Sequence, residues 1–387
     1  MANTIKLGTD SNWAVKENNL LAYNDENNIF KPIDFEFTRD SGATRVNEQG
    51  LIENVPSGVP RIDFSDGKGS LLLEPLSRNL ITHSNEFDNV VWFNTIDGSG
   101  VNPIITPSVG LSPDGSNNAY RIQADQGVLG ATNRSAIAFN FSITTELDYT
   151  ITLYVKSNTG SDQSFNIDST GIVSPQTFTA TSEWQRFEVN GQGLITGGQQ
   201  LRIGLINNAN NTTCDLLIYG VMVEQQSYAT SYIPTSGATA TRNADTASKT
   251  GLGNYINSSE GVFYAEIKTD KSTASYIELN DGTSSNRISI GYSGLSAALR
   301  FVNSTDNITR TEPTTRTNYN KLAVKWSATE VSLFLNGIKT DTITPSASVV
   351  GLSKIDFSTA ASFQGKVKDV RVYNQALTDT QLQQLTS

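Results

Sequence analysis

The stretch "DYTITLYVKS", Asp148 to Ser157, carries the pattern that decides the fold. Apolar side chains recur in it at every second residue, at Tyr149, Ile151, Leu153 and Val155. Alternate residues of an extended chain point to the same face, so this stretch predicts a β-strand with one face in a core. The same alternation returns in "LRIGLIN" and "DLLIYGVMVEQ", between turns rich in Gly, Asn and Ser. We therefore predict an all-β protein made of antiparallel β-sandwiches.

A second block of alternating strands begins near Gly261. Within it, Asn336-Gly337 lies between "EVSLFL" and "IKTDTI", which predicts a hairpin with a two-residue type I′ turn. Near the end of the chain, Thr378 is followed three residues later by Gln381. This spacing is a capping box and predicts a short terminal helix.

The length of the chain, 387 residues, exceeds what one ordinary core organises. We predict three parts: an N-terminal segment over 1–84, a first sandwich over 85–240 and a second sandwich over 251–387 that folds alone. The run "PTSGATATRNADTASKTGLGN" lacks an alternating apolar face and is interpreted as the junction between the sandwiches. The N-terminal segment has too few apolar residues for its own core. We expect it to be extended and to pack against a neighbour or another protein, using Trp13 and Leu71–Leu73.

A short polar phrase, Ser-Gly-Ala-Thr, occurs twice, at 41–44 and at 236–239. An arginine and an asparagine follow each copy closely. One interpretation is coincidence, since these residue types are abundant here. The other is that both copies mark seams between folded units.

The composition excludes several classes of partner. Hydrophobic residues make up 37% of the chain and charged residues 17%, with a formal net charge of −10. Without clustered Lys and Arg, we expect no nucleic-acid partner, and an anionic membrane surface would repel the chain. The most apolar stretch, "LLIYGVMV", is too short to span a bilayer, so we expect no membrane insertion. Cys214 is the only cysteine, which excludes an intrachain disulfide and fits assembly in a reducing cytosol.

Several phrases near the N-terminus resemble a known group of proteins. They are "ATRVNEQGLIE" (Ala43–Glu53), "PRIDF" (Pro60–Phe64), "SLLLEP" (Ser70–Pro75) and "RNLITHSNEFDN" (Arg78–Asn89). This region resembles the N-terminal module of bacteriophage virion proteins described as tail fibre, tail or head-spike proteins, especially in phages of Bacteroidota.

The rest of the chain extends the resemblance. The first sandwich resembles a carbohydrate-binding-module-like jelly roll that ends in "GVMVEQQSYATSYIPTSGATATRNAD" (Gly220–Asp245). The C-terminal part resembles a laminin-G/concanavalin-A-like domain, through "KLAVKWSATEVSLFLNGIKT" (Lys321–Thr340) and "FQGKVKDVRVYNQALTDTQLQQL" (Phe363–Leu385). These motifs are specific for architecture and say little about the ligand.

The resemblance implies a role on the phage particle. It implies a virion fibre, spike or capsid decoration protein that is assembled in the host cytoplasm, exposed on the particle surface and involved in host attachment. The N-terminal segment would contact other virion proteins, the chain would form a homo-oligomer, and glycans of the cell surface or the environment would be bound. The motifs leave head and tail locations open. The alternatives are a purely structural capsid or tail component and a polysaccharide depolymerase.

The residues needed for catalysis are mostly missing. His83 is the only histidine, and one Cys with one His excludes structural zinc of the usual kind. A glycosidase needs two carboxylates across a cleft, and no "ExDxxE"-like run occurs. The nearest runs, "YAEIKTD" and "YIELND", are interpreted as solvated strand ends. We therefore expect no catalytic residue, no metal centre, no cofactor and no enzymatic activity.

Ligand contacts are expected in the loops of the second sandwich, because a rigid sandwich can hold loops whose backbone stays exposed. The candidates near predicted turns are Asn280, Asp281, Tyr292 and Asp306. Amide and carboxylate groups can pair with sugar hydroxyls, and the tyrosine ring can cover the apolar face of a sugar. The turn at Asn280-Asp281 and the loop 303–307 also carry the oxygen ligands that calcium uses, although plain turns need no metal.

Overall fold

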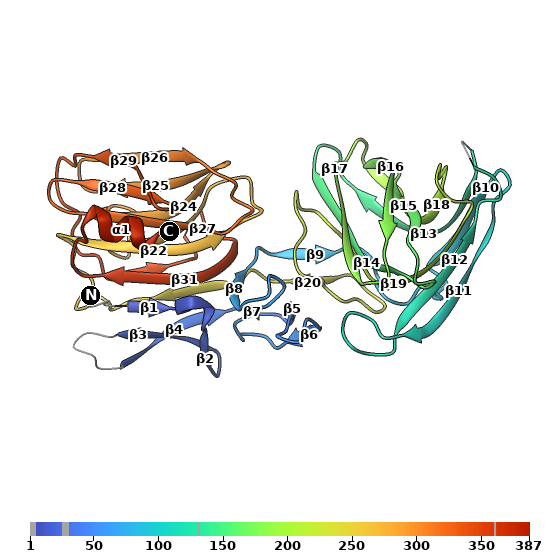
Figure 1. The fold of residues 1–387 in the computed structure, drawn as a ribbon, viewed down its shortest axis with the longest axis horizontal. Helices are drawn as coiled ribbons and strands as arrows, with labels where there is room; N and C mark the ends of the chain where they lie inside the picture. The colour runs from blue at the N-terminus through green and yellow to red at the C-terminus, as the bar shows by residue number, and fades with distance from the viewer. Residues whose placement is uncertain (1–4, 25–30, 130–131, 360) are drawn as a thin grey trace. The chain divides into compact units, whose positions relative to one another are not determined.

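The structure is a computed structural model that describes residues 5–24, 31–129, 132–359 and 361–387. Its described part is built of strands, with one α-helix, α1 (Asp379–Leu385) (Figure 1). The chain forms two compact units. Unit 1 comprises Met1–Glu48, Val55–Pro75 and Asn243–Ser387, and unit 2 comprises Gln49–Asn54 and Leu76–Arg242. The prediction of an all-β protein with two sandwiches is confirmed.

Unit 1 contains two antiparallel sheets that enclose one core. The first sheet consists, in order of pairing, of β29 (Ile338–Ile343), β28 (Val331–Leu335), β27 (Asn320–Trp326), β22 (Gly261–Lys268) and β31 (Gly365–Tyr373). The second consists of β21 (Thr246–Lys249), β30 (Lys354–Asp356), β23 (Ser275–Asn280), β24 (Arg287–Ser293), β25 (Ser296–Val302) and β26 (Asn307–Pro313).

N-terminal strands connect these two sheets. β1 and β8 pair with β31, β3 pairs with β1, β2 and β4, and β4 pairs with β21 of the second sheet. The N-terminal elements are β1 (Ile5–Leu7), the 3-10 turn η1 (Thr9–Ser11), β2 (Ala14–Lys16), β3 (Asn19–Asn24), β4 (Lys31–Thr38), β7 (Ile62–Asp63) and β8 (Ser70–Leu73). Two further short strands are β5 (Ala43–Val46) and β6 (Ile52–Val55).

The N-terminal segment is therefore not a separate extended part, as its polar composition had suggested. Leu20, Phe35 and Leu71 are fully buried in the same core as the C-terminal strands. Burial of each such side chain stabilises the fold by about 1.5–3 kcal/mol. The few apolar residues of this segment do not form a core of their own because they complete a shared one. Trp13 packs against that core too.

The predicted junction also contains structure. β21 lies inside the polar run and pairs with both β4 and β30. A short strand between two neighbours needs only one inward side chain, and Ala247, which is buried, supplies it. The predicted parts 1–84, 85–240 and 251–387 thus differ from the observed division, because strands from both ends of the chain share the core of unit 1.

Two local predictions in unit 1 are confirmed. Asn336 and Gly337 both have positive φ, 47° and 84°, as a type I′ turn between β28 and β29 requires. Thr378 caps α1: its side chain accepts a hydrogen bond from the backbone N–H of Gln381, and the side-chain oxygen of Gln381 accepts one from the backbone N–H of Thr378. Local backbone chemistry was sufficient to predict both features.

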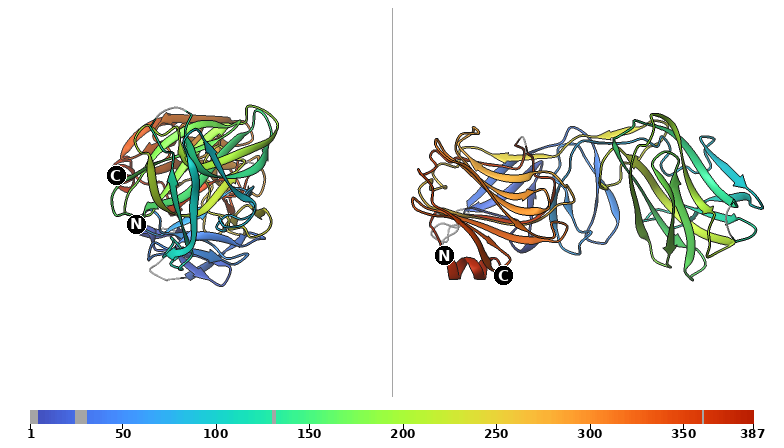
Figure 2. Two further views of the ribbon diagram at one scale, coloured as in Figure 1. Left: turned by 90° about the vertical axis from the view of Figure 1, so that its right-hand side faces the viewer. Right: turned by 90° about the horizontal axis from the view of Figure 1, so that it is seen from above.

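Unit 2 is a sandwich of two five-stranded sheets (Figure 2). The first consists of β10 (Trp92–Asp97), β13 (Arg134–Ile143), β18 (Gly197–Ile206), β15 (Gln163–Ser169) and β16 (Val173–Ala180). The second consists of β11 (Val101–Gly110), β12 (Ala119–Asp125), β19 (Thr213–Glu224), β14 (Asp148–Ser157) and β17 (Gln185–Gln192). The short strands β9 (Ser77–Asn79) and β20 (Ala240–Arg242) pair with each other.

The core of unit 2 follows the alternation read from the sequence. β14 has the bounds of the opening stretch, and its residues Tyr149, Ile151 and Leu153 are buried in the core. Trp92 joins them, with its ring centroid 5.1 Å from that of Phe139, and its Nε1 donates a hydrogen bond to the backbone oxygen of His83.

No helix within the described ranges is both long enough and apolar enough to cross a membrane.

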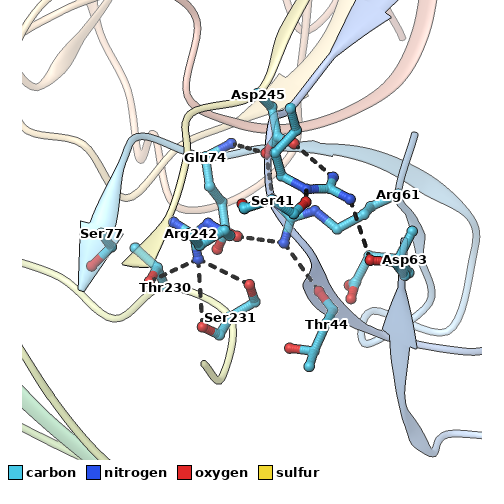
Figure 3. A network of polar contacts seen from close by, with 12 residues as sticks. Ser41, Thr44, Arg61, Asp63, Glu74, Ser77, Thr230, Ser231, Arg242 and Asp245 are labelled. Atoms are coloured by element: carbon cyan, nitrogen blue, oxygen red, sulfur yellow. Dashed lines mark hydrogen bonds and ion pairs between the residues drawn. The ribbon is translucent and has the colours of Figure 1, made fainter. Parts of the chain in front are cut away.

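The N-terminal phrases quoted above meet in a buried ionic network of unit 1 (Figure 3). Arg39 Nη1 donates to Asp245 Oδ1 at 3.0 Å, and Arg61 pairs with the other oxygen of that carboxylate. Arg61 also forms an ion pair with Glu74 at 2.6 Å. Burial alone would lower the pKa of Arg61, but the charges of Glu74 and Asp245 outweigh it and raise that pKa. Arg39 and Arg61, like Glu74 and Asp245, therefore have a structural role.

The same region explains the repeated phrase. Ser41, in the first copy, accepts a hydrogen bond from the backbone N–H of Asn243 at 2.9 Å. The side chain of Asn243 donates to the backbone oxygen of Asp40. The chain passes between the units after residues 48, 54, 75 and 242, and the first and last of these boundaries lie shortly after the two copies. Both copies thus lie near boundaries between the units, as the second interpretation predicts.

Candidate ligand-binding surfaces

The predicted loop residue Asp281 supports its own turn between β23 and β24. Its Oδ1 accepts a hydrogen bond from the backbone N–H of Thr283 at 2.8 Å, and its Oδ2 accepts one from Asn286 at 2.9 Å. Burial acts to raise the pKa of Asp281, but the hydrogen bonds from Thr283 and Asn286 lower it. The carboxylate is therefore ionised and engaged within the loop.

Asp306 does the same in the turn between β25 and β26. Its Oδ2 accepts hydrogen bonds from the side chain of Asn303 and the backbone N–H of Ser346, each at 2.8 Å. The hydrogen bond from Asn303 is the main reason that the pKa of Asp306 lies below its ordinary value. Both predicted carboxylates thus stabilise turns of the second sheet of unit 1.

The predicted stacking role of Tyr292 is wrong. Its side chain lies in the core together with Ile288 and Ile290, which share its face of β24. Its hydroxyl donates to the backbone oxygen of Ile267 at 2.8 Å and accepts a hydrogen bond from Asn320. A ring enclosed between two sheets cannot cover a sugar, so the four predicted residues do not form one site.

Asn280 points to a different part of the molecule. It shares one face of β23 with Tyr276 and Glu278, and this is the face turned away from the core. We define the unit 1 face as the outward side chains of the second sheet around this strand: Tyr276, Glu278, Asn280, Arg287, Ser289, Arg300 and Asp356.

The unit 1 face is a polar strip in which Arg287 and Arg300 are partly exposed, whereas the other five side chains are buried. Cross-strand pairing places Glu278 beside Ser289 and Asp356, and Ser289 beside Arg300. Side chains at the edge strand β26, such as Thr309, are exposed, whereas Ser289 is fully buried.

Glu278 is a buried carboxylate on this face, which corrects its interpretation as a solvated strand end. It is 3% exposed. Ser289 Oγ donates to its Oε1 at 3.1 Å, and Arg287 Nη1 lies 3.7 Å from the same oxygen. Burial raises the pKa of Glu278, and the attraction of Arg287 only partly offsets this effect. The attraction of Arg287 and Arg300 therefore compensates only part of the cost of burying this carboxylate.

Unit 2 has a comparable polar face, which we call the unit 2 face. It is the outward side of β10, β13, β18 and β15 in the first sheet. In one cross-strand row it presents Phe93, Ala138, Arg202 and Asp168, and in the next row Thr95, Ala136, Gly204 and Asn166. Small residues occupy the middle, with an aromatic ring on one side and polar groups on the other.

The polar groups of the unit 2 face are held rigidly. Arg202 donates to Asp168 through two nitrogens, with the Nε–Oδ1 distance at 2.8 Å. Burial raises the pKa of Asp168 in spite of the hydrogen bond from Arg202. Asn166 donates to Thr177 and accepts a hydrogen bond from Asn208.

The opposite outer face of each sandwich is covered by its own chain. In unit 1, α1 lies against the first sheet, with Leu382 in a cluster that includes Phe334 and Tyr264 (Figures 1 and 2). In unit 2, the outer side of the second sheet carries a cluster that includes Tyr219 and Ile52. No comparable apolar cluster of described residues covers the unit 1 face or the unit 2 face. Each sandwich therefore has one outer sheet face that is polar, opposite an outer face with an apolar cluster.

Sequence reasoning missed these faces, although part of the signal was present. In "SFNIDS", the inward residues Phe165 and Ile167 alternate with Asn166 and Asp168. Asn and Asp are rare within strands, so their alternation with apolar residues was informative. Which face remains uncovered depends on distant segments, and no local pattern reports it.

A metal site has no support from the geometry. Among the residues that the structure describes, no group of three or more His, Cys, Asp or Glu side chains is placed to hold an ion.

The C-terminal part of the chain is similar to a known family. Residues 255–383, a third of the chain, match the model of the Concanavalin A-like lectin/glucanases superfamily. This part of the resemblance is confirmed. No curated protein matches the chain.

Solved structures give only distant similarities. The carbohydrate-binding module CBM40 of a Ruminococcus gnavus IT-sialidase bound to alpha2,3 sialyllactose is 17% identical, covers 34% of this chain and 84% of its own, and has a TM-score of 0.30. Domain 4 of AbnA, a GH43 extracellular arabinanase from Geobacillus stearothermophilus, in complex with arabinotriose, is 17% identical over 42% and 84% of the chains, with a TM-score of 0.31. The CBM22-1–CBM22-2 tandem of Paenibacillus barcinonensis Xyn10C is 12% identical over 77% and 98%, with a TM-score of 0.28. TM-scores this low do not establish a shared fold.

Proposed function

We propose that this chain is a non-enzymatic, glycan-binding protein of a bacteriophage virion. The observation that carries the proposal is that each sandwich has one polar outer face, with partly exposed side chains such as Phe93, Arg202, Arg287 and Arg300, while its opposite outer face carries an apolar cluster. Glycans present rows of hydroxyl groups, and fixed amide, guanidinium and carboxylate groups can pair with several of them at once. The match of residues 255–383 to a superfamily that includes lectins supports this class of ligand.

The unit 2 face has the better geometry for neutral sugars. Arg202 and Asp168 hold each other, so their remaining hydrogen-bonding positions are fixed in space. Phe93, which is partly exposed, lies in the same row and offers an aromatic surface to the apolar side of a sugar ring.

The virion location rests on the resemblance of the N-terminal phrases to phage fibre and spike proteins. The proposal places the protein on the particle surface, held by other virion proteins and assembled as a homo-oligomer, in either a head or a tail position. Several copies on one particle would make weak sites effective, because multivalent attachment multiplies affinity when geometry permits. Imaging of labelled virions would test this location.

Glycan binding is tested with the full chain. We would measure retention in native gels containing purified host capsular polysaccharides, then compare Phe93→Ala with the control Val90→Ala, since Val90 is 91% exposed. We expect retention by at least one polysaccharide and a loss of roughly 10-fold in affinity for Phe93→Ala, because stacking on an aromatic face contributes about 1–1.5 kcal/mol. The absence of retention by every polysaccharide would favour a purely structural role.

A hydrolase is the second candidate, and one observation favours it. Glu278 and Asp356 are cross-strand neighbours, a spacing close to that of the two carboxylates of retaining glycosidases. However, Asp356 accepts hydrogen bonds from Lys354 at 2.5 Å and from the backbone N–H of Ser358 at 2.8 Å, so both its oxygens are engaged. We therefore favour binding. Release of reducing ends from a host polysaccharide that is abolished by Glu278→Gln would reverse this choice.

A further inference from the structure

We propose that the unit 1 face binds the anionic group, a carboxylate or a sulfate, of an acidic glycan through Arg287 and Arg300. This inference rests on the proposed function and adds the chemical class of the ligand. It also assigns a second surface, separate from the unit 2 face.

The two arginines lie close enough to share one anion. Arg287 on β24 pairs across the strands with Val302, and Arg300 on β25 pairs with Ser289. Their positions are therefore diagonal neighbours on one face of adjacent strands. Such residues have backbones roughly 7–8 Å apart, within reach of long side chains.

Both guanidinium groups are poorly partnered inside the protein. The Nε atoms of Arg287 and Arg300 are buried and have no hydrogen-bond partner among the described residues. Arg300 Nη2 donates a hydrogen bond to Asn307 Oδ1 at 3.4 Å. No carboxylate of the described residues forms an ion pair with Arg300. Arg287 has only the 3.7 Å approach to Glu278.

Other arginines of this protein show what full pairing looks like. Arg202 binds Asp168 through two nitrogens, and Arg121 binds Asp215 in the same way at 2.8 and 2.6 Å. A guanidinium carries five donors in a planar fork that matches an oxyanion. Arg287 and Arg300 are only weakly paired and partly exposed, so together they can receive an anion from outside.

The local charge also favours an anion, although the whole chain carries a net charge of −10. Asp356 is neutralised by Lys354. Burial raises the pKa of Glu278, which reduces the negative charge that opposes an incoming anion. The two arginines thus dominate the centre of the strip.

The neighbouring groups favour a glycan over a small free anion. Exposed threonines such as Thr309, which pairs across the strands with Arg300, line the β26 edge of the same face. These neutral polar groups extend along the strands beyond the arginines. A sugar ring attached to the anionic group would lie over them.

The direct test is a titration of the full-length protein followed through the Nε–Hε NMR signals of its arginines. The three probes share one ring: D-glucuronate, D-glucose 6-sulfate and D-glucose. We expect the Arg287 and Arg300 signals, assigned with single Arg→Lys variants, to shift with one or both anions and not with glucose. A response to glucuronate alone identifies a carboxylate site, and a response to the sulfate alone identifies a sulfate site. No shift with either anion, or an equal shift with glucose, would overturn the inference.

A second measurement uses polysaccharides. Arg300→Gln and Arg287→Gln should each weaken binding of polygalacturonate or dextran sulfate on the order of 10-fold, as expected for loss of a charge-assisted hydrogen bond. The matched control is Arg310→Gln, because Arg310 lies on the next strand and is paired with Asp341 at 3.1 Å. Thermal unfolding checks that each variant is folded. Arg300→Lys keeps the charge and loses the fork, so it should also weaken binding.

The outcomes separate this inference from the broader function. Binding of neutral polysaccharides that depends on Phe93, with no preference for acidic ones, would refute the anionic site and leave glycan binding standing. Failure of all polysaccharides, neutral and acidic, would contradict both.

Discussion

At the scale of single residues, the buried charges separate structural roles from candidate functional ones. Asp245 receives hydrogen bonds from two arginines and from the backbone of Glu74, so its charge is fully compensated. Glu278 and Arg300 have weaker partners: Arg287 lies 3.7 Å from Glu278, and Asn307 lies 3.4 Å from Arg300. A buried charge with close partners of opposite charge stabilises the fold. A buried charge with weak partners is expected where a ligand supplies the missing partner.

The first prediction concerns Asp245. Asp245→Asn leaves Arg39 and Arg61 without their carboxylate in a buried place, so we expect unit 1 to lose about 3–5 kcal/mol of stability. Thermal unfolding of the full chain by calorimetry measures this loss. The control Asp341→Asn removes an exposed ion pair with Arg310 and should cost less than about 1 kcal/mol. Equal effects of the two substitutions would show that the network is not structural.

The second prediction concerns acid. The hydrogen bond from Lys339 to Glu330 lowers the pKa of Glu330 from 4.5 to about 2. For Asp66, burial acts to raise the pKa, but hydrogen bonds from Lys268 and Lys366 lower it from 3.8 to about 2. A carboxyl with a depressed folded pKa stabilises the fold above its unfolded pKa, and this contribution disappears as the pH falls through the folded pKa.

We therefore expect unit 1 to lose stability as the pH falls from about 4.5 to 2. Glu330→Gln should flatten this loss relative to the wild-type protein in urea unfolding at a series of pH values. An unchanged slope would mean that Glu330 is not coupled to Lys339 in solution.

At the scale of elements, the sequence predicted local features better than the membership of strands in sheets. The turn at Asn336-Gly337 and the cap of α1 depend only on neighbouring residues. β4 was overlooked, although Ile33, Phe35 and Phe37 alternate within it, because the surrounding segment is polar. The unit 1 face and the unit 2 face were not predictable from local sequence. The opposite outer faces are covered by α1 in unit 1 and by residues such as Ile52 in unit 2, which are distant in sequence from the strands they cover.

The third prediction follows from this sharing of strands. A fragment of residues 251–387 lacks β1, β3, β4, β8 and β21, so its core would be open along one side. We expect the fragment to be unfolded or aggregated, in contrast to the sequence-based expectation that it folds alone. Far-UV circular dichroism and NMR dispersion of the fragment, compared with the full chain, measure this. A cooperative, well-dispersed fragment would show that the N-terminal strands are dispensable.

At the scale of the whole molecule, each of the two sandwiches has one polar outer face. The chain as a whole is acidic, so long-range attraction does not bring it to an acidic glycan, and recognition must be local. Affinity per site is expected to be modest, with strength supplied by the number of copies. We therefore expect adhesion to glycans to depend on Phe93 and Arg300 and to disappear when both side chains are changed.

The measurement that tests glycan binding most directly is adhesion of beads coated with the full-length protein to host cells. We predict adhesion by the wild-type protein, its loss after periodate oxidation of the cell-surface glycans, and its loss in the combined variant Phe93→Ala with Arg300→Gln. The control variant Val90→Ala with Arg310→Gln should adhere like the wild type. Undiminished adhesion to periodate-treated cells, or by the Phe93→Ala/Arg300→Gln variant, would contradict the account.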